Sequence, residues 1–418
     1  MIKNGIKNLY QKGFFHILTS SILNKIMIFC SGMFIVRFLT KNDFGIYSYV
    51  QNLLSFFLLL NGFGINGGFI QYGSKENEKI KEGLSIYCLK YGFSINVFLS
   101  AIIILYSYFG DFKIEEARII FRLMAFLPNF TFLIELLQID LRVNLKNKEM
   151  SVLLNLNTFF NLIGMVLGAK LSGLYGMILG KYIGNIMTLV LYSKSYYKIL
   201  LRNDKLINFK LKQRVKKFSK INMLNNGISQ FLYLMDIFFI GLILKDKNII
   251  ASYKTATLIP FALNFIPLSV ITYLYPYLVK KSNDTLGLKK YVKDLLKYLG
   301  IVNFLIVVCG IILSEYIIIY IFGREYVDSI IYFKLLMIGY FFIGTFRIPF
   351  INILTAIGKL KYNLFITILS GVLNIVLNII LIKKYGSMGA VITTLSVFIF
   401  SSIISGIFLL KYFMFKNK

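Results

Sequence analysis

The sequence predicts an all-α integral membrane protein with about twelve transmembrane helices, and its composition and segment lengths are the observations that predict it. Of its 418 residues, 57% are hydrophobic and 16% aromatic, and the mean hydropathy is +0.72. A soluble domain of this length requires far more polar surface. Apolar runs of about 20 residues, the length that crosses roughly 30 Å of hydrocarbon, follow one another with short polar interruptions. The bilayer is therefore the expected solvent.

The apolar runs define the expected spans. They cover residues 16–38, 44–69, 83–108, 117–141, 150–171, 174–193, 217–243, 250–278, 293–313, 329–357, 362–383 and 388–413. The basic segment 194–217 is the longest polar interruption, and it divides the spans into two sets of six. We therefore expect an N-lobe at 1–193, a cytoplasmic linker at 194–217 and a C-lobe at 218–418. The linker either lies on anionic headgroups or is a solvated loop.

The net charge of +29 is better explained by membrane topology than by nucleic acid binding. Nucleic-acid modules carry basic residues on a folded soluble face, and no soluble domain is expected here. Lysine and arginine instead concentrate in every second loop, most densely in 194–217. By the positive-inside rule, we expect the N-terminus, the linker and the C-terminus in the cytoplasm.

An internal repeat supports the division into halves. Asn161 lies twelve residues before Gly173-Leu-Tyr-Gly176, and Asn374 lies twelve residues before Gly386-Ser-Met-Gly389. Each motif joins the fifth and sixth predicted helices of its half. Because both halves would start on the same side of the membrane, the repeat is expected to be parallel, about an axis along the membrane normal.

Motifs of enzymes and metal sites are not recognisable in the sequence. It contains no G-x-S-x-G, no Walker P-loop and no H-E-x-x-H. Cys30, Cys88 and Cys309 all fall inside predicted spans, and His16 is the single histidine, so we expect neither a disulfide framework nor a metal site. We therefore expect a protein that is not an enzyme and has no cofactor. Any pumping would draw on an ion gradient or on substrate flux.

Positive charges inside the predicted spans are candidate ligands for an anionic substrate. A charged side chain at mid-bilayer costs at least about 2.5 kcal/mol, so it should face protein or a watery cavity. Lys25, Lys90 and Arg347 lie too deep to reach the interface easily, and Lys181 is close to mid-span. Arg122 is nearer the outer end of its helix, where reaching the interface is an equal alternative. This excess of cations suits phosphate above all anions.

Uncharged polar residues recur at helical spacing in several spans. The candidates for lining a polar cavity are Asn24, Asn161, Asn222, Asn226, Ser229 and Asn374. Such side chains either line a cavity or join helices through hydrogen bonds. The carboxylates Asp236 and Glu135, both inside predicted spans, are the candidates for binding a coupling ion.

Several short motifs follow one another along nearly the whole chain. The first is Arg37-Phe-Leu-Thr-Lys-Asn-Asp-Phe-Gly-Ile-Tyr47, between the first two predicted helices. The others are Gly62-Phe-Gly-Ile-Asn-Gly-Gly68, Asp236, Ala251-Ser-Tyr253, Tyr275-Pro276, Phe322-Gly-Arg-Glu-Tyr326 and Gly386-Ser-Met-Gly389. In order and spacing they resemble those of bacterial polysaccharide flippases. Gln71 departs from that pattern, because an arginine often stands at this position.

The resemblance implies the multidrug/oligosaccharidyl-lipid/polysaccharide exporter (MOP) superfamily, and within it the O-antigen or capsule repeat-unit flippases. Such proteins have a MATE-like fold of two six-helix lobes around a central, often cationic cavity. They move undecaprenyl-pyrophosphate-linked oligosaccharides across the bacterial cytoplasmic membrane by alternating access. The implied partners are this lipid-linked glycan, membrane lipids, a proton or sodium gradient, and polysaccharide polymerase and chain-length proteins.

Two other functions stay open at this point. A MATE-type multidrug or cation exporter would share the fold but would want an acidic cavity, which the basic excess disfavours. A membrane polysaccharide polymerase or ligase typically carries a large outer loop with catalytic Arg or His, whereas the outer loops predicted here are short. The glycan and the coupling ion do not follow from the sequence.

Overall fold

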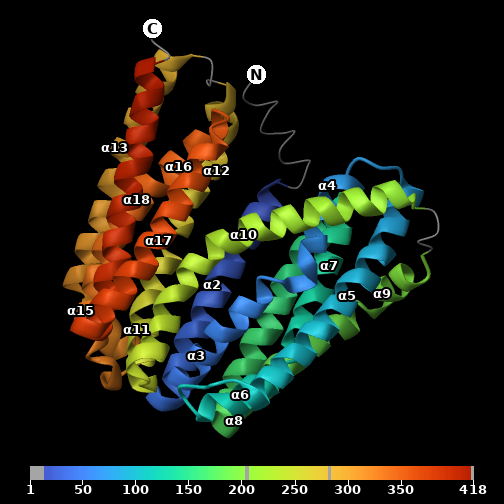
Figure 1. Ribbon diagram of the computed structural model, residues 1–418, viewed down its shortest axis with the longest axis horizontal. Helices are drawn as coiled ribbons and strands as arrows, with labels where there is room; N and C mark the ends of the chain where they lie inside the picture. The colour runs from blue at the N-terminus through green and yellow to red at the C-terminus, as the bar shows by residue number, and fades with distance from the viewer. Residues whose placement is uncertain (1–13, 203–206, 281–283, 416–418) are drawn as a thin grey trace. The chain divides into compact units, whose positions relative to one another are not determined.

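The described part of the chain is almost entirely helical and forms two compact units. The computed structural model describes residues 14–202, 207–280 and 284–415, except for some side chains within the helices. The first unit extends to Phe231 and the second begins at Leu232. Figure 1 shows the helices of both units, coloured from blue near the N-terminus to red near the C-terminus.

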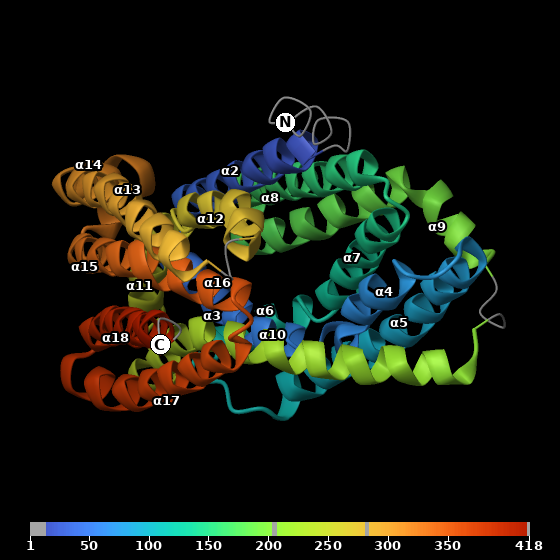
Figure 2. The same ribbon diagram turned by 90° about the horizontal axis from the view of Figure 1, so that it is seen from above.

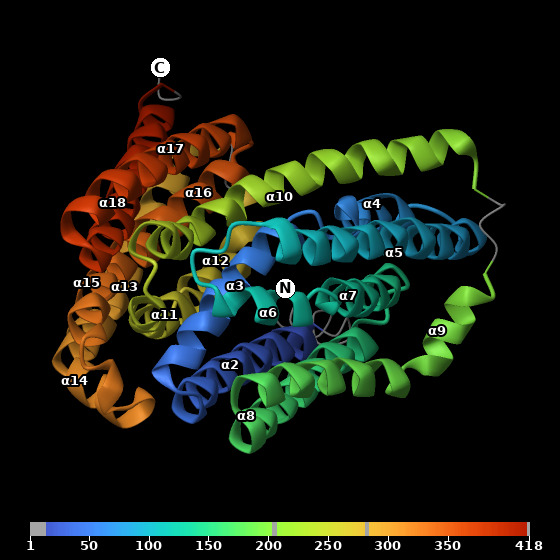
Figure 3. The same ribbon diagram turned by 60° about the horizontal axis from the view of Figure 1, so that its bottom comes forward.

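The first unit consists of helices that pack against one another in pairs. Its helices are α2 (Phe14–Phe38), α3 (Lys41–Leu58), α4 (Ile65–Gly73), α5 (Glu78–Phe109), α6 (Glu116–Leu123), α7 (Leu127–Val143), α8 (Asn147–Leu191), α9 (Ser193–Leu200) and α10 (Phe209–Leu244). α10 continues past Phe231 and so belongs to both units. α2 packs along α8, and α7 packs against both α5 and α8 (Figure 3).

The second unit contains the remaining helices. They are α11 (Lys247–Ala262), α12 (Phe265–Lys280), α13 (Thr285–Ile312), α14 (Ser314–Tyr316), α15 (Ser329–Phe342), α16 (Ile348–Ala356), α17 (Leu360–Tyr385) and α18 (Ser387–Phe415). α17 packs along α18, and α15 packs against α13 and α18 (Figure 2). A π-helical turn at Ile343–Arg347 joins α15 to α16.

Helices cover every one of the predicted spans. Among the described residues, nine helical stretches are long and apolar enough to cross a membrane. One of them, α8, covers two predicted spans because its backbone reverses at Ser172 and Gly173. α2 and α10 cover the two predicted spans that are left. The prediction of an all-α membrane fold with about twelve helices is confirmed.

Large apolar side chains are exposed along the spans. Phe98 on α5 is 67% exposed, Leu171 on α8 is 82% exposed and Phe304 on α13 is 57% exposed. Soluble proteins rarely expose apolar surface continuously along a helix, because it would remain in contact with water. In a bilayer these side chains meet lipid tails, so the exposed apolar faces agree with a multi-pass membrane protein.

Polar caps fix where several helices begin. The Thr40 hydroxyl accepts a hydrogen bond from the Asp43 backbone N–H at 3.1 Å, and thereby caps α3. Asn77 caps α5 in the same way, and Asp246 caps α11. The first backbone N–H groups of a helix have no partner within the helix, so such caps stabilise its start. Thr40 lies in the motif after Arg37, which gives that motif a structural role.

Two turns with the same backbone conformation underlie the internal repeat. Gly173 has φ 57° and ψ −138°, and Gly386 has φ 59° and ψ −142°. Glycine adopts this conformation without the strain that a Cβ atom would add. Three residues after each turn, a Cβ on Gly176 would lie 2.2 Å from the Gly168 oxygen, and one on Gly389 would lie 2.1 Å from the Leu381 oxygen. The repeated glycines therefore make the same tight reversal in both units.

The described parts of the basic segment, 194–202 and 207–217, are largely helical and pack within the first unit. Ile199 of α9 and Val215 of α10 are buried in the same apolar cluster as Leu137 of α7. Arg202 forms an ion pair of 2.6 Å with Asp140. The division between the units falls downstream of this segment because these contacts hold it to the first unit.

Tyr196 adds a further contact between this segment and α7. Its hydroxyl donates to the backbone oxygen of Leu133. Burial, together with the nearby Asp140 carboxylate, raises the pKa of Tyr196 well above its ordinary value. The hydroxyl therefore stays protonated and remains a donor over the physiological pH range.

The close packing of the two arms of α8 leads to a stability prediction. In Gly180→Ala, the new Cβ would lie 1.8 Å from the Gly164 backbone oxygen, so the arms must separate. We expect the free energy of unfolding, measured by SDS titration in mixed micelles, to fall by about 1–3 kcal/mol. Gly300→Ala is the control, because its Cβ would meet only Thr345 at an ordinary 3.6 Å. Equal stability of the two variants would contradict the proposed packing.

Candidate functional site

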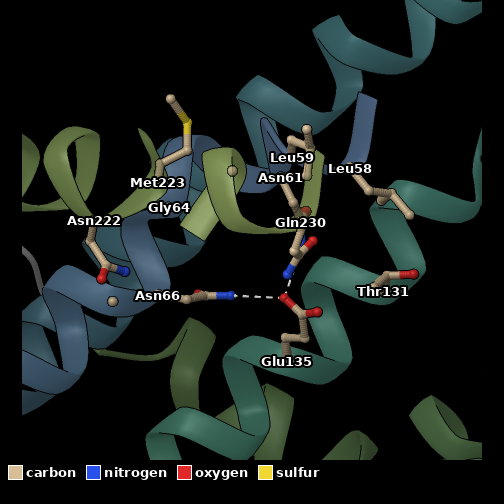
Figure 4. A pocket seen from close by; sticks show the side chains of 12 residues that line it. Leu58, Leu59, Asn61, Gly64, Asn66, Thr131, Glu135, Asn222, Met223 and Gln230 are labelled. Atoms are coloured by element: carbon tan, nitrogen blue, oxygen red, sulfur yellow. Dashed lines mark hydrogen bonds between the residues drawn. The ribbon is translucent and has the colours of Figure 1, made fainter. Parts of the chain in front are cut away.

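A polar pocket in the first unit surrounds Glu135. It has a volume of about 360 Å³ and lies between the end of α3, the start of α4, α7 and α10. Its lining residues are Leu58, Leu59, Asn61, Gly64, Asn66, Gly67, Thr131, Glu135, Asn222, Met223, Gly227 and Gln230. Figure 4 shows the side chains of Asn61 and Asn66 directed at the Glu135 carboxylate. Asn61 Nδ2 donates to Glu135 Oε2 at 2.8 Å, and Asn66 Nδ2 donates to the same oxygen at 3.3 Å.

A break between α3 and α4 brings these two amides to the carboxylate. Gly62, Phe63 and Gly64 have φ values of 53°, 49° and 67°, which no helix continues through. Phe63 is not a glycine, so its left-handed conformation is strained. The break is held by Asn96 of α5, whose Oδ1 accepts from the Gly62 N–H at 2.9 Å and whose Nδ2 donates to Asn61 Oδ1 at 2.6 Å. Asn61 is thereby oriented before any ligand arrives.

Asp236 lies at the centre of a hydrogen-bonded cluster in the second unit. Its Oδ2 accepts from the Tyr253 hydroxyl at 2.7 Å and from the Thr394 hydroxyl at 2.6 Å. Its Oδ1 accepts from Asn378 Nδ2 at 2.8 Å and from Asn374 Nδ2 at 3.2 Å. Asp236 is only 5% exposed, and these donors come from α11, α17 and α18. Four donors stabilise a carboxylate that burial would otherwise disfavour.

Two cavities adjoin Asp236, and each contains one basic residue. Asp236, Tyr253 and Lys254 line a cavity of about 310 Å³. Arg347 and Asn374 line a narrower one together with Asp236. Arg347 is only 9% exposed and lies in the π-helical turn between α15 and α16. The second unit therefore brings together three residues that were predicted for the site, namely Asp236, Arg347 and Asn374.

The other predicted cations lie in different places. Lys25 on α2 and Lys90 on α5 are exposed. Lys181 Nζ donates to Gln51 Oε1 at 3.1 Å. Arg122 Nε donates to Ser107 Oγ at 3.1 Å, and its guanidinium lies 3.7 Å from the centre of the Tyr108 ring. Lys181 and Arg122 thus have local partners within the first unit, and the substrate role of all four remains a prediction.

The predicted polar residues mostly join helices. Asn24 donates to Thr158 Oγ1, which links α2 to α8. Asn161 Nδ2 lies 3.0 Å from Asn185 Oδ1 and links the two arms of α8. Asn222 lines the Glu135 pocket. The side chains of Asn226 and Ser229 lie outside the described residues.

Several residues of these sites were not among the predicted site residues. Asn61 and Asn66 hold Glu135, and they flank or belong to the glycine-rich motif that begins at Gly62. Tyr253, Asn378 and Thr394 surround Asp236. The glycine-rich motif was the available signal for the first pair, because consecutive glycines allow the left-handed backbone that breaks the helix.

Aromatic and basic side chains meet on α5 and α10. Lys212 Nζ lies 5.3 Å from the centre of the Tyr87 ring, and Lys216 Nζ lies 4.5 Å from that of Tyr91. The two rings stack with their centres 6.1 Å apart. These cation–π contacts place positive charge close to the helix face that carries Lys90.

Comparison with known proteins identifies the family. A family model described as polysaccharide biosynthesis protein matches residues 34–331. The chain belongs to this family. The resemblance inferred from the sequence motifs is thereby confirmed. No curated protein sequence matches the chain.

Solved structures show which fold this family member adopts. The chain is similar to the lipid II flippase MurJ in an inward closed conformation, with a TM-score of 0.77 and 17% identity over 93% of this chain and 86% of that one. It is also similar to an inward-facing multidrug resistance MATE transporter of the MOP superfamily, with a TM-score of 0.76 and 12% identity over 94% and 95% of the two chains. A MOP superfamily transporter from Pyrococcus furiosus gives a TM-score of 0.56 and 13% identity over 97% and 94%. The protein therefore has the MOP fold.

The Asp236 cluster leads to a second stability prediction. Asp236→Ala removes the acceptor of four buried donors, and each buried unsatisfied donor costs about 1–3 kcal/mol. Because these donors are buried, we expect the free energy of unfolding of this variant in mixed micelles to fall by about 2 kcal/mol or more. Asp294→Ala is the control, since Asp294 is exposed on α13. A loss no larger than that of the control would show that the cluster contributes nothing to stability.

Proposed function

We propose that this protein is a flippase that moves undecaprenyl-pyrophosphate-linked oligosaccharide across the bacterial cytoplasmic membrane. The observation that carries the proposal is the combination of a polysaccharide biosynthesis family member with the fold of MOP transporters. Polysaccharide assembly needs a membrane step because lipid-linked units are polar at one end and cannot cross hydrocarbon unaided. The similarity to a lipid II flippase supports a lipid-linked substrate. O-antigen, capsule and exopolysaccharide repeat units all fit this chemistry.

Cationic side chains are proposed to hold the pyrophosphate. Arg347 is nearly buried in an apolar span beside Asp236, and a guanidinium presents paired N–H groups that match phosphate oxygens. Lys90, with Lys212 and Lys216 on the facing part of α10, supplies positive charge in the first unit. Lys25 is proposed as a further ligand. The lipid tail would remain in the bilayer while the headgroup crosses.

Alternating access that involves the N-lobe and the C-lobe is proposed as the mechanism. The positive-inside distribution supports cytoplasmic N- and C-termini. The moved glycan would then pass to polymerase and chain-length proteins on the outer face. The MATE-type exporter remains a second candidate, because the Glu135 pocket provides a carboxylate that an organic cation would seek. Unchanged drug susceptibility of a deletion strain would remove that candidate.

Asp236 is proposed to bind the coupling ion. Its carboxylate is surrounded by the Tyr253 and Thr394 hydroxyls and by the amides of Asn374 and Asn378. Hydroxyl and amide oxygens are suitable ligands for a hard cation. Rotating each amide would exchange its nitrogen for its oxygen, because the two ends are nearly isosteric. With the amides rotated, the cluster could bind a sodium ion through its oxygen atoms. If the coupling ion is a proton, it would bind to the Asp236 carboxylate.

The phosphate assignment is tested by complementation of a flippase-null strain. We expect Lys25→Ala, Lys90→Ala and Arg347→Ala each to reduce the flux of lipid-linked glycan at least about tenfold, because each removes a charge-assisted hydrogen bond. Lys289→Ala on the exposed surface of α13 is the matched control. Mass spectrometry of the accumulated lipid-linked glycan measures the effect and identifies the glycan. Full complementation by all three variants would exclude these residues as phosphate ligands.

The coupling assignment is tested in proteoliposomes. We expect wild-type transport to accelerate in a sodium or proton gradient, and Asp236→Asn to lose that acceleration while still exchanging substrate without a gradient. Asparagine keeps the volume of the side chain but removes its charge. Its oxygen can accept from the two amides, and its N–H groups can donate to the Tyr253 and Thr394 hydroxyl oxygens. Asp294→Asn serves as the control. The idea fails if wild-type transport ignores both gradients.

A further inference from the structure

The pocket around Glu135 differs in composition from the rest of this basic protein. The chain has 47 Lys and Arg residues, yet the described residues that line the pocket include none of them. They supply one carboxylate, one hydroxyl and four amides, and no aromatic ring. We infer that this pocket is a subsite for an uncharged sugar residue of the transported glycan. This inference rests on the proposed function and adds to it the part of the substrate that the pocket binds.

The size of the pocket suits a sugar rather than an ion. Its volume is about 360 Å³, which lies within the roughly 300–1,000 Å³ typical of small-molecule sites. It is roughly ten times the share of one water molecule in the liquid, about 30 Å³. A bare ion needs oxygen ligands on all sides at about 2.0–2.6 Å. Among the described residues, four hydrogen-bonding groups contact the Asp236 carboxylate, whereas two contact that of Glu135.

The Glu135 carboxylate and the Thr131 hydroxyl offer acceptors to the pocket. Both amide donors to Glu135 end on Oε2, so among the described residues none takes up the accepting capacity of Oε1. The Thr131 hydroxyl donates to the Leu127 backbone oxygen at 3.0 Å, which leaves its lone pairs for a ligand. Asn61 uses its oxygen for Asn96 and its nitrogen for Glu135, so it positions the carboxylate. The carboxylate and the hydroxyl therefore favour a ligand that brings donors.

The acceptors in the pocket suit a sugar better than they suit a pyrophosphate or an organic cation. Sugar hydroxyls and acetamido N–H groups are donors that a carboxylate oxygen accepts. A pyrophosphate offers only acceptors and negative charge, so it brings no donor to Glu135. A flat organic cation would find no aromatic face for a cation–π contact. Asn222 and Gln230 present amides, which both donate and accept, toward the remaining hydroxyls.

The pocket is also held in shape before binding. The left-handed backbone at Gly62–Gly64 fixes Asn61, and Asn96 locks that turn by accepting from Gly62 N–H. On the opposite wall, Gly64 and Gly67 allow close approach of α10, since a Cβ on either would lie within 3 Å of atoms of Ser219 or Asn222. A preformed site loses less conformational entropy when a flexible sugar binds.

Direct binding is measurable because the chain contains no tryptophan. Leu59→Trp places a single fluorophore in the pocket lining, and Leu58→Trp provides a second reporter should the first fail to fold. The probes are the methyl glycosides of glucose, galactose and N-acetylglucosamine, with sodium chloride, inorganic pyrophosphate and tetraphenylphosphonium as competitors. We expect a saturable emission shift with at least one glycoside and no competition by the other three compounds.

Variants of the carboxylate complete the binding test. In either reporter, Glu135→Gln should raise the glycoside Kd at least about tenfold, because it replaces one acceptor oxygen of the carboxyl group with an N–H donor. Glu149→Gln, an exposed glutamate at the start of α8, should leave the Kd unchanged. The inference is overturned if no glycoside shifts the emission of either reporter. It is also overturned if sodium or tetraphenylphosphonium displaces the glycoside, or if Glu135→Gln binds as wild type does.

Translocation in proteoliposomes separates failure of this inference from failure of the proposed function. The probes are undecaprenyl pyrophosphate carrying a disaccharide and undecaprenyl pyrophosphate without sugar. We expect Glu135→Gln to slow the disaccharide form at least tenfold relative to the sugar-free form. If wild type translocates neither lipid, the proposed function fails whatever the reporters bind. If wild type translocates the glycolipid and Glu135→Gln does so equally well, the sugar subsite alone fails.

Discussion

A carboxylate inside an apolar helical bundle has to accept hydrogen bonds, because neither water nor lipid replaces them there. Both units of this protein meet that requirement with neutral amides and hydroxyls. Asp236 is enclosed by four donors from three helices. Glu135 accepts two hydrogen bonds on one carboxylate oxygen, and its side chain also lines a pocket. The two acids therefore differ in the number of donors that contact them within the described part of the chain, four for Asp236 and two for Glu135.

Supplying these donors requires the backbone to depart from regular helix. The break at Asn61–Gly64 turns two asparagines toward α7, and Arg347 sits in a π-helical turn within an otherwise apolar stretch. Strained or irregular backbone persists only where neighbouring groups hold it, and here Asn96 does so at Gly62. These two irregular segments thus coincide with polar sites.

The sequence predicts the fold of this protein more completely than its sites. Bilayer thickness sets the length of a span, so hydropathy alone locates helices such as α5, predicted at 83–108 and found at Glu78–Phe109. Asp236 and Glu135 stand out because ionisable residues are rare in apolar runs. Their partners do not, since Asn61 reaches Glu135 only through a helix break, and Tyr253 reaches Asp236 from another helix. Likewise, the local partner of Arg122 is set by packing that no periodicity reveals.

The packing of segment 194–217 has a practical consequence for experiments on the living cell. It is the longest polar stretch between spans, and reporter domains used to map membrane topology are commonly fused into such stretches. Here Ile199 and Val215 belong to the apolar cluster of the first unit, and Arg202 is paired with Asp140. Insertions are tolerated where the backbone is exposed and makes few contacts. A fusion beside Ile199, Arg202 or Val215 would disrupt the unit that it was meant to report on.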